Sequence, residues 1–211
     1  IMSRPPSLQS LADSLAAGQT TSRGLVERAL DRINDPAGEG TRVFIKIHAE
    51  QALVAADASD RSRAAGIVPS PLAGLPVSVK DLFDLAGEPT TAGSKLLQNA
   101  APAAADAPAI ARLRRAGAIV MGRTNMTEFA YSGLGINPHY GTPRNPWDRE
   151  TGRIPGGSSS GAAVSVTDGM AAAAIGSDTG GSVRIPASLC GITGFKPTTR
   201  RNPATGGWPL S

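Results

Sequence analysis

Hydrophobic side chains follow a helical period in the N-terminal part of the chain. Residues 7–17 start at a serine and stop before Gly18, which predicts an amphipathic helix with a serine cap and a glycine stop. The polar cap at residues 20–22 starts a second helix, in which these apolar residues recur at helical spacing: Leu25, Val26, Ala29, Leu30 and Ile33. Residues 49–65 predict a third helix, ended by Gly66.

Short apolar runs between the helical segments predict β-strands. The expected strands are residues 43–47, 77–80, 118–121, 171–175 and a run near 192–195. Further helices are expected at residues 106–116, 124–130 and 162–167, with a short helix starting at Ser182. Strands that alternate with helices indicate an α/β fold, with a mixed β-sheet core covered by helices on both faces.

Glycine, proline and asparagine dominate the rest of the C-terminal half. Residues 132–157 predict a long loop, and loops of this length are uncommon unless they have a function. Two glycine-rich runs, 156–161 and 176–181, each come directly before a predicted helix. The last residues, 200–211, also predict a loop.

Composition excludes several classes of protein. The 211 residues include 40% hydrophobic and only 18% charged residues, which indicates a folded domain rather than a disordered chain. No apolar run reaches 18 residues and no signal segment is visible, so we expect no membrane partner and a cytoplasmic location. One cysteine, Cys190, excludes an internal disulfide. With only His48 and His139 besides, no metal site is expected.

The basic net charge of +4 raises the question of nucleic-acid binding. However, the arginines are scattered, and the only adjacent pairs are Arg114–Arg115 and Arg200–Arg201. Aromatic residues make up 4% of the chain, too few for a base-stacking platform. We therefore expect no direct nucleic-acid partner.

Lys80 is the first candidate for chemistry. It is one of four lysines and stands at the end of the apolar strand predicted at residues 77–80. A lysine buried there would lose hydration, its pKa would fall, and the neutral amine could act as a general base. On its own, the segment is more typical of a surface lysine at a strand end, because lysines are mostly exposed.

The two glycine-rich runs are the other candidates. Residues 156–161, Gly-Gly-Ser-Ser-Ser-Gly, fit a helix cap or an anion site at a helix N-terminus. They also contain a G-x-S-x-G pattern, but no histidine follows Ser159, which argues against a hydrolase nucleophile elbow. In residues 177–184, two glycines precede Ser182, and such a turn forms either a simple cap or a nest of N–H groups suited to an oxyanion.

Together these segments resemble the amidase signature family. The blocks at residues 156–161 and 176–198 look like its signature, and the separation of 24 positions from Ser158 to Ser182 matches that of its two catalytic serines. Residues 76–81 resemble its catalytic-lysine segment, and residues 124–130 and 145–147 resemble further family stretches. The resemblance extends over residues 7–211.

The resemblance implies an amidase, a hydrolase that cleaves the C–N bond of linear amides through an acyl-enzyme. Its triad would be Ser182 as nucleophile, Ser158 as bridging serine after a cis peptide from Gly157, and Lys80 as base. The oxyanion hole would be formed by the backbone N–H groups of Thr179, Gly180, Gly181 and Ser182. Supporting roles fall to Gly157, Ser159, Asp178 and Arg184. No metal or organic cofactor is required.

Family members are longer than this chain. The resemblance therefore implies that residues 1–211 are the N-terminal part of a single domain, with a helical lead-in and one strand at 1–66 and a catalytic core segment at 67–211. The C-terminal half would be needed to complete the fold. We expect a small-molecule amide as substrate. A homodimer is possible, and the sequence does not decide the oligomeric state. The alternatives are a glutamyl-tRNA amidotransferase component, its A subunit, which releases ammonia from glutamine, and a non-catalytic fragment.

Overall fold

The first two helices begin at the predicted caps. The computed structural model describes residues 5–198 and 201–209. Helix α1 covers Leu8–Ala16 and helix α2 covers Ser22–Asn34. The hydroxyls of Ser7 and Thr21 each accept a backbone N–H three residues further along, which satisfies a donor that the helix leaves unpaired.

A four-stranded mixed sheet forms the centre of the molecule. Its strands are β1 (Phe44–Ile47), β2 (Pro76–Lys80), β3 (Ile119–Thr124) and β4 (Ala173–Ile175), arranged in the order β1-β3-β2-β4. Strand β2 runs parallel to both β3 and β4, whereas β1 is antiparallel to β3. The predicted mixed sheet is therefore confirmed.

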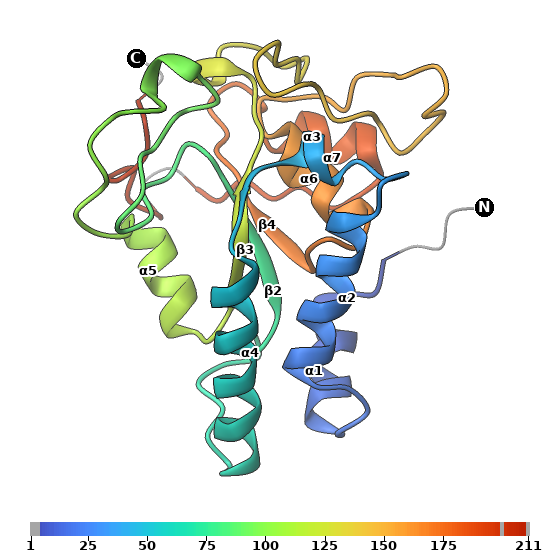
Figure 1. Ribbon diagram of the computed structural model, residues 1–211, viewed down its shortest axis with the longest axis vertical. Coiled ribbons are helices and arrows are strands. Elements are labelled where there is room, and N and C mark those ends of the chain that lie inside the picture. The colour runs from blue at the N-terminus through green and yellow to red at the C-terminus, as the bar shows by residue number, and fades with distance from the viewer. Residues whose placement is uncertain (1–4, 199–200, 210–211) are drawn as a thin grey trace.

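Helices cover both faces of this sheet. On one face, Ile110 of α5 (Pro108–Arg115) packs against Val79 and Val120. On the other face, apolar residues of α2, α4 (Ala49–Ala64) and α6 (Ser160–Thr167) share a larger core with Ile119 and Met121. Figure 1 shows α5 on one side of the strands and α2, α6 and α7 on the other.

Alternation along β2 decides where its polar residues lie. Every residue of this strand is buried. Val79 packs on the α5 face, so the neighbouring residues Ser78 and Lys80 point to the α6 face. There, the Ser78 hydroxyl lies 2.8 Å from that of Ser165 in α6. The alternation thus places the Lys80 side chain in a buried position beneath the first turn of α6.

The helix predicted at residues 124–130 is wrong. Thr124 instead ends β3, where it pairs with both Phe44 and Lys80. Only a single 3₁₀ turn, η2 (Glu128–Ala130), follows, and Phe129 within it has a left-handed φ of 50°. The start of this segment therefore belongs to the sheet, and the residues that follow Thr124 do not form an α-helix.

The strand predicted near residues 192–195 is also wrong. Helix α7 covers Arg184–Cys190 and ends at Gly191, which has a left-handed φ of 72°. The next N–H, of Ile192, donates back to the carbonyl of Ala187 at 3.0 Å. Because this donor is used by the helix end, the segment does not enter the sheet, and Phe195 is 77% exposed.

Short elements and loops complete the fold. Two short elements were not predicted, the single-turn helix α3 (Gly40–Val43) and the 3₁₀ turn η1 (Lys95–Leu97). The predicted loop at 132–157 is confirmed, and it runs over the same end of the molecule as η1 and η2 (Figure 1). None of the helices in the described part of the chain is long and apolar enough to cross a membrane.

Candidate active site

Lys80 is fully buried at the carboxyl end of β2. Its Nζ lies 2.6 Å from the hydroxyl oxygen of Ser158 and 2.8 Å from that of Ser177. Burial lowers the pKa of Lys80 to about 7, although the negative charge of Asp178 opposes this shift. A large share of the amine is therefore uncharged at neutral pH. Of the two sequence-based interpretations, the structure supports the buried lysine over the surface lysine.

Ser158 is held by the backbone around it. The Gly157–Ser158 peptide bond is cis. The N–H of Gly157 donates to the carbonyl of Gly133 at 2.8 Å, and the Ser158 carbonyl accepts from Thr127 at 3.1 Å. A Cβ on Gly157 would lie 2.6 Å from the nitrogen of Gly135, so only glycine fits. The loop thereby fixes the serine hydroxyl over Lys80.

Ser182 reaches the same region from the loop between β4 and α7. Its carbonyl accepts the N–H of Ser159 at 3.2 Å, and the residue is half-buried. Within residues 5–198 and 201–209, no hydrogen bond joins the hydroxyls of Ser158 and Ser182. The structure thus brings Lys80 and Ser158 into direct contact and places Ser182 beside them through the backbone.

Asp178 organises the loop that carries Ser182. Its carboxylate is bound by the guanidinium of Arg184 through two contacts of 2.9 Å. It also accepts backbone N–H groups of Gly181 at 2.9 Å and Val183 at 3.2 Å. The hydrogen bond from Arg184 is the main reason that the pKa of Asp178 lies far below its ordinary value. A permanent carboxylate therefore sets the shape of this turn.

This arrangement changes the expected oxyanion hole. The Gly181 N–H points at Asp178 and is not free for a substrate oxygen. The N–H groups of Thr179, Gly180 and Ser182 have no hydrogen-bond acceptor within the described ranges. Thr179 and Gly180 are exposed, so their donors are accessible. Three of the four expected donors are thus without an acceptor in the described part of the chain, and two of them belong to exposed residues.

Ser159 ties the two glycine-rich loops together. Its hydroxyl donates to the carbonyl of Ser177 at 3.4 Å. A Cβ on Gly176 would come within 2.7 Å of the Ser159 hydroxyl oxygen, so the Ser159 side chain packs closely against the backbone of Gly176. Ser159 therefore contacts the loop that carries Ser182 rather than the amine of Lys80.

Ser177 is a site residue that the sequence analysis did not select. It follows β4 by two residues, whereas Lys80 ends β2, and the two strands are parallel neighbours. Because the carboxyl ends of parallel strands meet at one edge of a sheet, a hydroxyl directly after β4 was a usable signal. It was missed because 97 residues separate it from Lys80 along the chain.

The remaining candidate groups do not join this site. Cys190 is buried, its thiol donates to the carbonyl of Pro155 at 3.4 Å, and burial raises its pKa to about 12. His139 contacts Glu128 at 3.0 Å and His48 contacts Glu88 at 2.8 Å. In the described part of the chain, no three His, Cys, Asp or Glu side chains gather as metal ligands would.

The family assignment follows from comparison with known proteins. A family model described as Amidase matches residues 24–211. The chain belongs to the amidase family. It is 47% identical over 194 residues to the A subunit of the glutamyl-tRNA(Gln) amidotransferase from Chromohalobacter salexigens, covering 92% of this chain and 39% of that protein. It is 46% identical over 200 residues to AtzE of the 1-carboxybiuret hydrolase from Pseudomonas sp. strain ADP, covering 95% and 43%.

Solved structures give the same result. A structure of a vestigial complex related to an s-triazine catabolic enzyme matches with a TM-score of 0.90 at 45% identity, covering 97% of this chain and 44% of that one. A peptide amidase in complex with the inhibitor chymostatin matches with a TM-score of 0.86 at 38% identity, covering 97% and 42%. The chain therefore spans about two-fifths of the length of the relatives it matches.

Proposed function

We propose that this chain carries the catalytic residues of an enzyme that hydrolyses a carboxamide. The observation that carries the proposal is the buried amine of Lys80, 2.6 Å from the Ser158 hydroxyl, beside the loop that bears Ser182. A protonated Lys80 would be a costly buried cation, because its amine contacts two hydroxyls and Asp178 is already bound by Arg184. A neutral lysine that accepts a proton explains its position.

The first half of the reaction forms an ester on the enzyme. Neutral Lys80 accepts the Ser158 proton as Ser158 takes the proton of Ser182, and the Ser182 oxygen attacks the amide carbon. This step requires the two serine hydroxyls to come together, and catalytic hydrogen bonds often tighten only when substrate is bound. The free N–H groups of Thr179, Gly180 and Ser182 supply donors for the oxyanion.

The second half releases the products. The proton held by Lys80 returns through Ser158 to the leaving nitrogen, the C–N bond breaks, and ammonia or an amine departs. A water molecule then attacks the ester carbon, its proton passes back along the same route to Ser182, and a carboxylic acid is released. Apart from the water molecule, each step uses only side chains and backbone N–H groups of this chain, and the cycle requires no cofactor.

The substrate pocket requires more polypeptide than these 211 residues. The matched relatives are more than twice as long, so we propose that the complete domain contributes the remaining walls of the pocket. We propose a small-molecule amide as substrate. The activity is therefore best tested on the polypeptide at the full length that its gene encodes.

A glutamine-dependent amidotransferase is the second candidate, with this chain in its A subunit. It is favoured by the 47% identity to a protein with that name. Such a protein would release ammonia from glutamine for transfer and would need companion chains. Robust ammonia release from simple amides by the intact polypeptide alone favours the amidohydrolase, whereas turnover that appears only with companions favours the amidotransferase.

Covalent labelling tests whether the site is catalytic at all. A fluorophosphonate probe should modify Ser182 of the intact protein, as located by peptide mass spectrometry, and Ser182→Ala should abolish the label. Ser188→Ala is the matched control, because Ser188 is an exposed serine in the neighbouring helix α7 and should leave labelling unchanged. A folded protein that takes no label at Ser182 would instead be a non-catalytic member of the family.

A further inference from the structure

Ser177 contacts the amine of Lys80, yet the proposed reaction gives it no role. Its hydroxyl oxygen lies 2.8 Å from Nζ, and within the described ranges this amine is its single hydrogen-bond partner. The amine is fully buried and also lies 2.6 Å from the Ser158 hydroxyl oxygen. Two serine hydroxyls therefore share one nitrogen, and only one of them passes a proton in the reaction.

The chemistry of a neutral amine limits what the two hydroxyls can do. A neutral lysine offers one lone pair and two N–H groups. The lone pair accepts one O–H, and in the proposed reaction that donor is Ser158. If Ser177 donated to the lone pair instead, Ser158 could not pass its proton to Lys80. The direction of the Ser177 hydrogen bond therefore decides whether the amine is a usable base.

The backbone holds Ser177 in place without help from its hydroxyl. Strand β4 pairs in parallel with β2, which brings the start of the following loop beside Lys80. The carbonyl of Ser177 accepts the Ser159 hydroxyl at 3.4 Å, and the next residue, Asp178, is bound by Arg184. The Ser177 oxygen is thus held on both sides, whereas the Lys80 amine ends a flexible carbon chain. A fixed oxygen of this kind can orient the amine.

The elements packed around Lys80 bring few charges to it. Strand β4 and helix α6 contain no charged residue, and the charged residue of β3, Arg123, lies on the α5 face, where it binds Asp81. The buried residues of α2 are all uncharged. In the described part of the chain, Asp178 is the one charge that acts on Lys80, and Arg184 binds it. Replacing Ser177 changes none of these groups.

We propose that Ser177 is a positioning residue: its hydroxyl oxygen accepts an N–H from Lys80 and thereby turns the lone pair of the amine toward Ser158. The proposal rests on the proposed role of Lys80 as the base. The same oxygen also accepts from the ammonium that forms when Lys80 takes the proton, and a charged donor makes the stronger hydrogen bond. Ser177 therefore assists the base both before and after the proton is transferred.

Removing this hydroxyl should have two measurable effects on amide hydrolysis by the full-length protein. Ser177→Ala should lower kcat about ten- to a hundredfold with little change in KM, because the base loses its orientation and the substrate contacts remain. It should also move the acid-side midpoint of kcat/KM down by about one pH unit, because the ammonium form loses an acceptor. Ser177→Thr keeps the hydroxyl and should restore most of both properties.

The direction of the pH shift distinguishes the proposed role from two others. If Ser177 donates to the lone pair, its removal destabilises the neutral amine and moves the midpoint up, which overturns the proposal. If Ser177 only supports the loop, Ser177→Ala lowers the free energy of unfolding and leaves the midpoint unmoved, which also overturns it. If Ser177→Ala does not fold, Ser177→Cys decides by the same criteria, because sulfur is a weak acceptor of similar size.

Ser78→Ala is the matched control. Ser78 is a buried serine on the same face of β2 as Lys80, but its hydroxyl contacts that of Ser165 and not the amine. Its removal should leave the pH midpoint where it is in the parent protein. A midpoint that moves equally in Ser78→Ala and Ser177→Ala would show a general effect of lost hydroxyls near the strand, and this result would overturn the specific role of Ser177.

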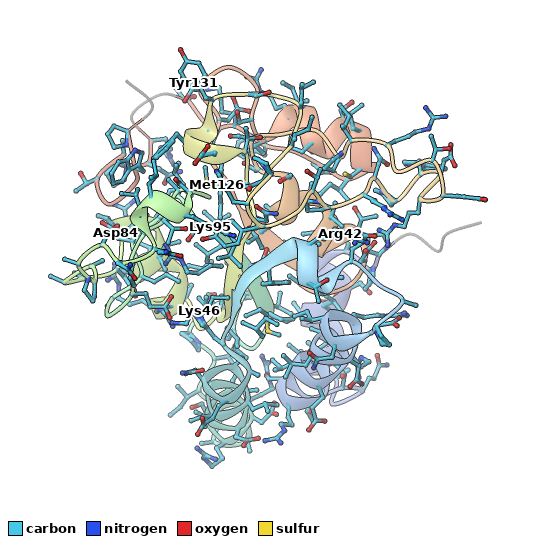
Figure 2. The ribbon with its side chains drawn as sticks, turned by 45° about the horizontal axis from the view of Figure 1, so that its top comes forward. Arg42, Lys46, Asp84, Lys95, Met126 and Tyr131 are labelled. Carbon is cyan, nitrogen blue, oxygen red and sulfur yellow. The ribbon has the colours of Figure 1, made fainter. Side chains whose placement is uncertain are left out.

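A direct titration separates failure of this proposal from failure of the proposed function. NMR of protein with ¹³Cε-labelled lysine follows the amine itself, with the Lys80 signal assigned by its loss in Lys80→Met. Lys46 and Lys95, labelled in Figure 2, are exposed and serve as internal references. A Lys80 signal that titrates at lower pH in Ser177→Ala, with an unmoved rate profile, supports the contact proposed for Ser177 and removes Lys80 from catalysis. An unmoved Lys80 signal overturns the proposal, and the proposed function stands if the parent rate still follows the Lys80 titration.

Discussion

Lys80 is a cationic side chain at a position where the protein gives a charge little support. Its amine is surrounded by strand β2, the first turn of α6 and two serine hydroxyls. Desolvation disfavours the ammonium form, and the one nearby carboxylate that opposes this effect, Asp178, is already bound by an arginine. At the level of single residues, the site is therefore built to keep an amine unprotonated.

Replacing this amine should remove most of the activity. Lys80→Ala eliminates the proposed base, and a positioned base commonly contributes about 10²–10⁴ in rate, so kcat/KM for amide hydrolysis should fall by that range. Lys95→Ala is the matched control, because Lys95 is exposed on η1, and it should retain the parent rate. Equal losses in the two variants would exclude Lys80 as the base.

The pH dependence gives a second prediction. The base must be deprotonated, so kcat/KM should rise with pH through the lowered pKa of Lys80, with its midpoint near 7. Asp178 stays ionised throughout this range, since its pKa is held far below it. Rates measured from acid to alkaline pH, with circular dichroism to confirm that the fold persists, provide the measurement. A flat profile across neutral pH would contradict the assignment.

The pairing of Lys80 with Ser158 was predicted from the family resemblance and not from the residue pattern. Residue patterns alone left Lys80 as either a buried base or a surface lysine, because burial depends on α6, which lies some 80 residues later in the chain. Ser177 and the occupied N–H of Gly181 depend on contacts between loops that no local pattern encodes.

At the level of elements, the start of helix α6 packs closely against the backbone at the ends of α3 and β3. A Cβ on Gly161 would lie 2.5 Å from the carbonyl oxygen of Val43 and 2.7 Å from the nitrogen of Asn125. The N–H of Gly161 also donates to the Asn125 carbonyl at 3.0 Å. This backbone-to-backbone packing holds the helix start, and hence Ser158, in place over β2.

This packing should reverse the usual effect of a helical glycine-to-alanine substitution. Gly→Ala in a helix ordinarily stabilises by up to about 1 kcal/mol, but Gly161→Ala must displace backbone atoms and should destabilise by about 1–3 kcal/mol. Gly24→Ala in α2 is the control, because its neighbours are the ends of polar side chains, and it should be neutral or stabilising. Urea denaturation measures the free energy of unfolding of each variant and of the parent protein. If Gly161→Ala and the parent have equal free energies of unfolding, α6 can shift at little cost.

Elements with a strong hydrophobic period were predicted well, and those decided by distant partners were not. Helices α1 and α2 carry their own caps and apolar stripes, so local sequence determines them. The segment at 124–130 was predicted as a helix, yet Thr124 pairs with β1 and β2 from elsewhere in the chain. Conversely, residues 192–195 resemble a strand, but their first N–H is bound by the end of α7.

For the molecule as a whole, β4 is one of the two edge strands of the sheet within the described residues, the other being β1. Strand β4 pairs with β2 on one side, and within residues 5–198 and 201–209 no strand pairs with its other side. All three residues of β4 are only half-buried. A cavity of about 700 Å³ lies beside it, lined by small and apolar residues that include Ala162, Val166, Ala174, Val183 and Ile192.

An open strand edge next to an apolar cavity is a site for pairing with another chain. We therefore expect the 211-residue polypeptide, when produced alone, to self-associate in a concentration-dependent way, as measured by size-exclusion chromatography with light scattering. Ala174→Lys places a charge on β4 and should weaken this association, whereas Ala55→Lys on the exposed side of α4 should not. If the polypeptide is monomeric at every concentration, or if both variants associate like the parent, then β4 is not the strand through which the chain self-associates. The sheet would then be stable without a further strand.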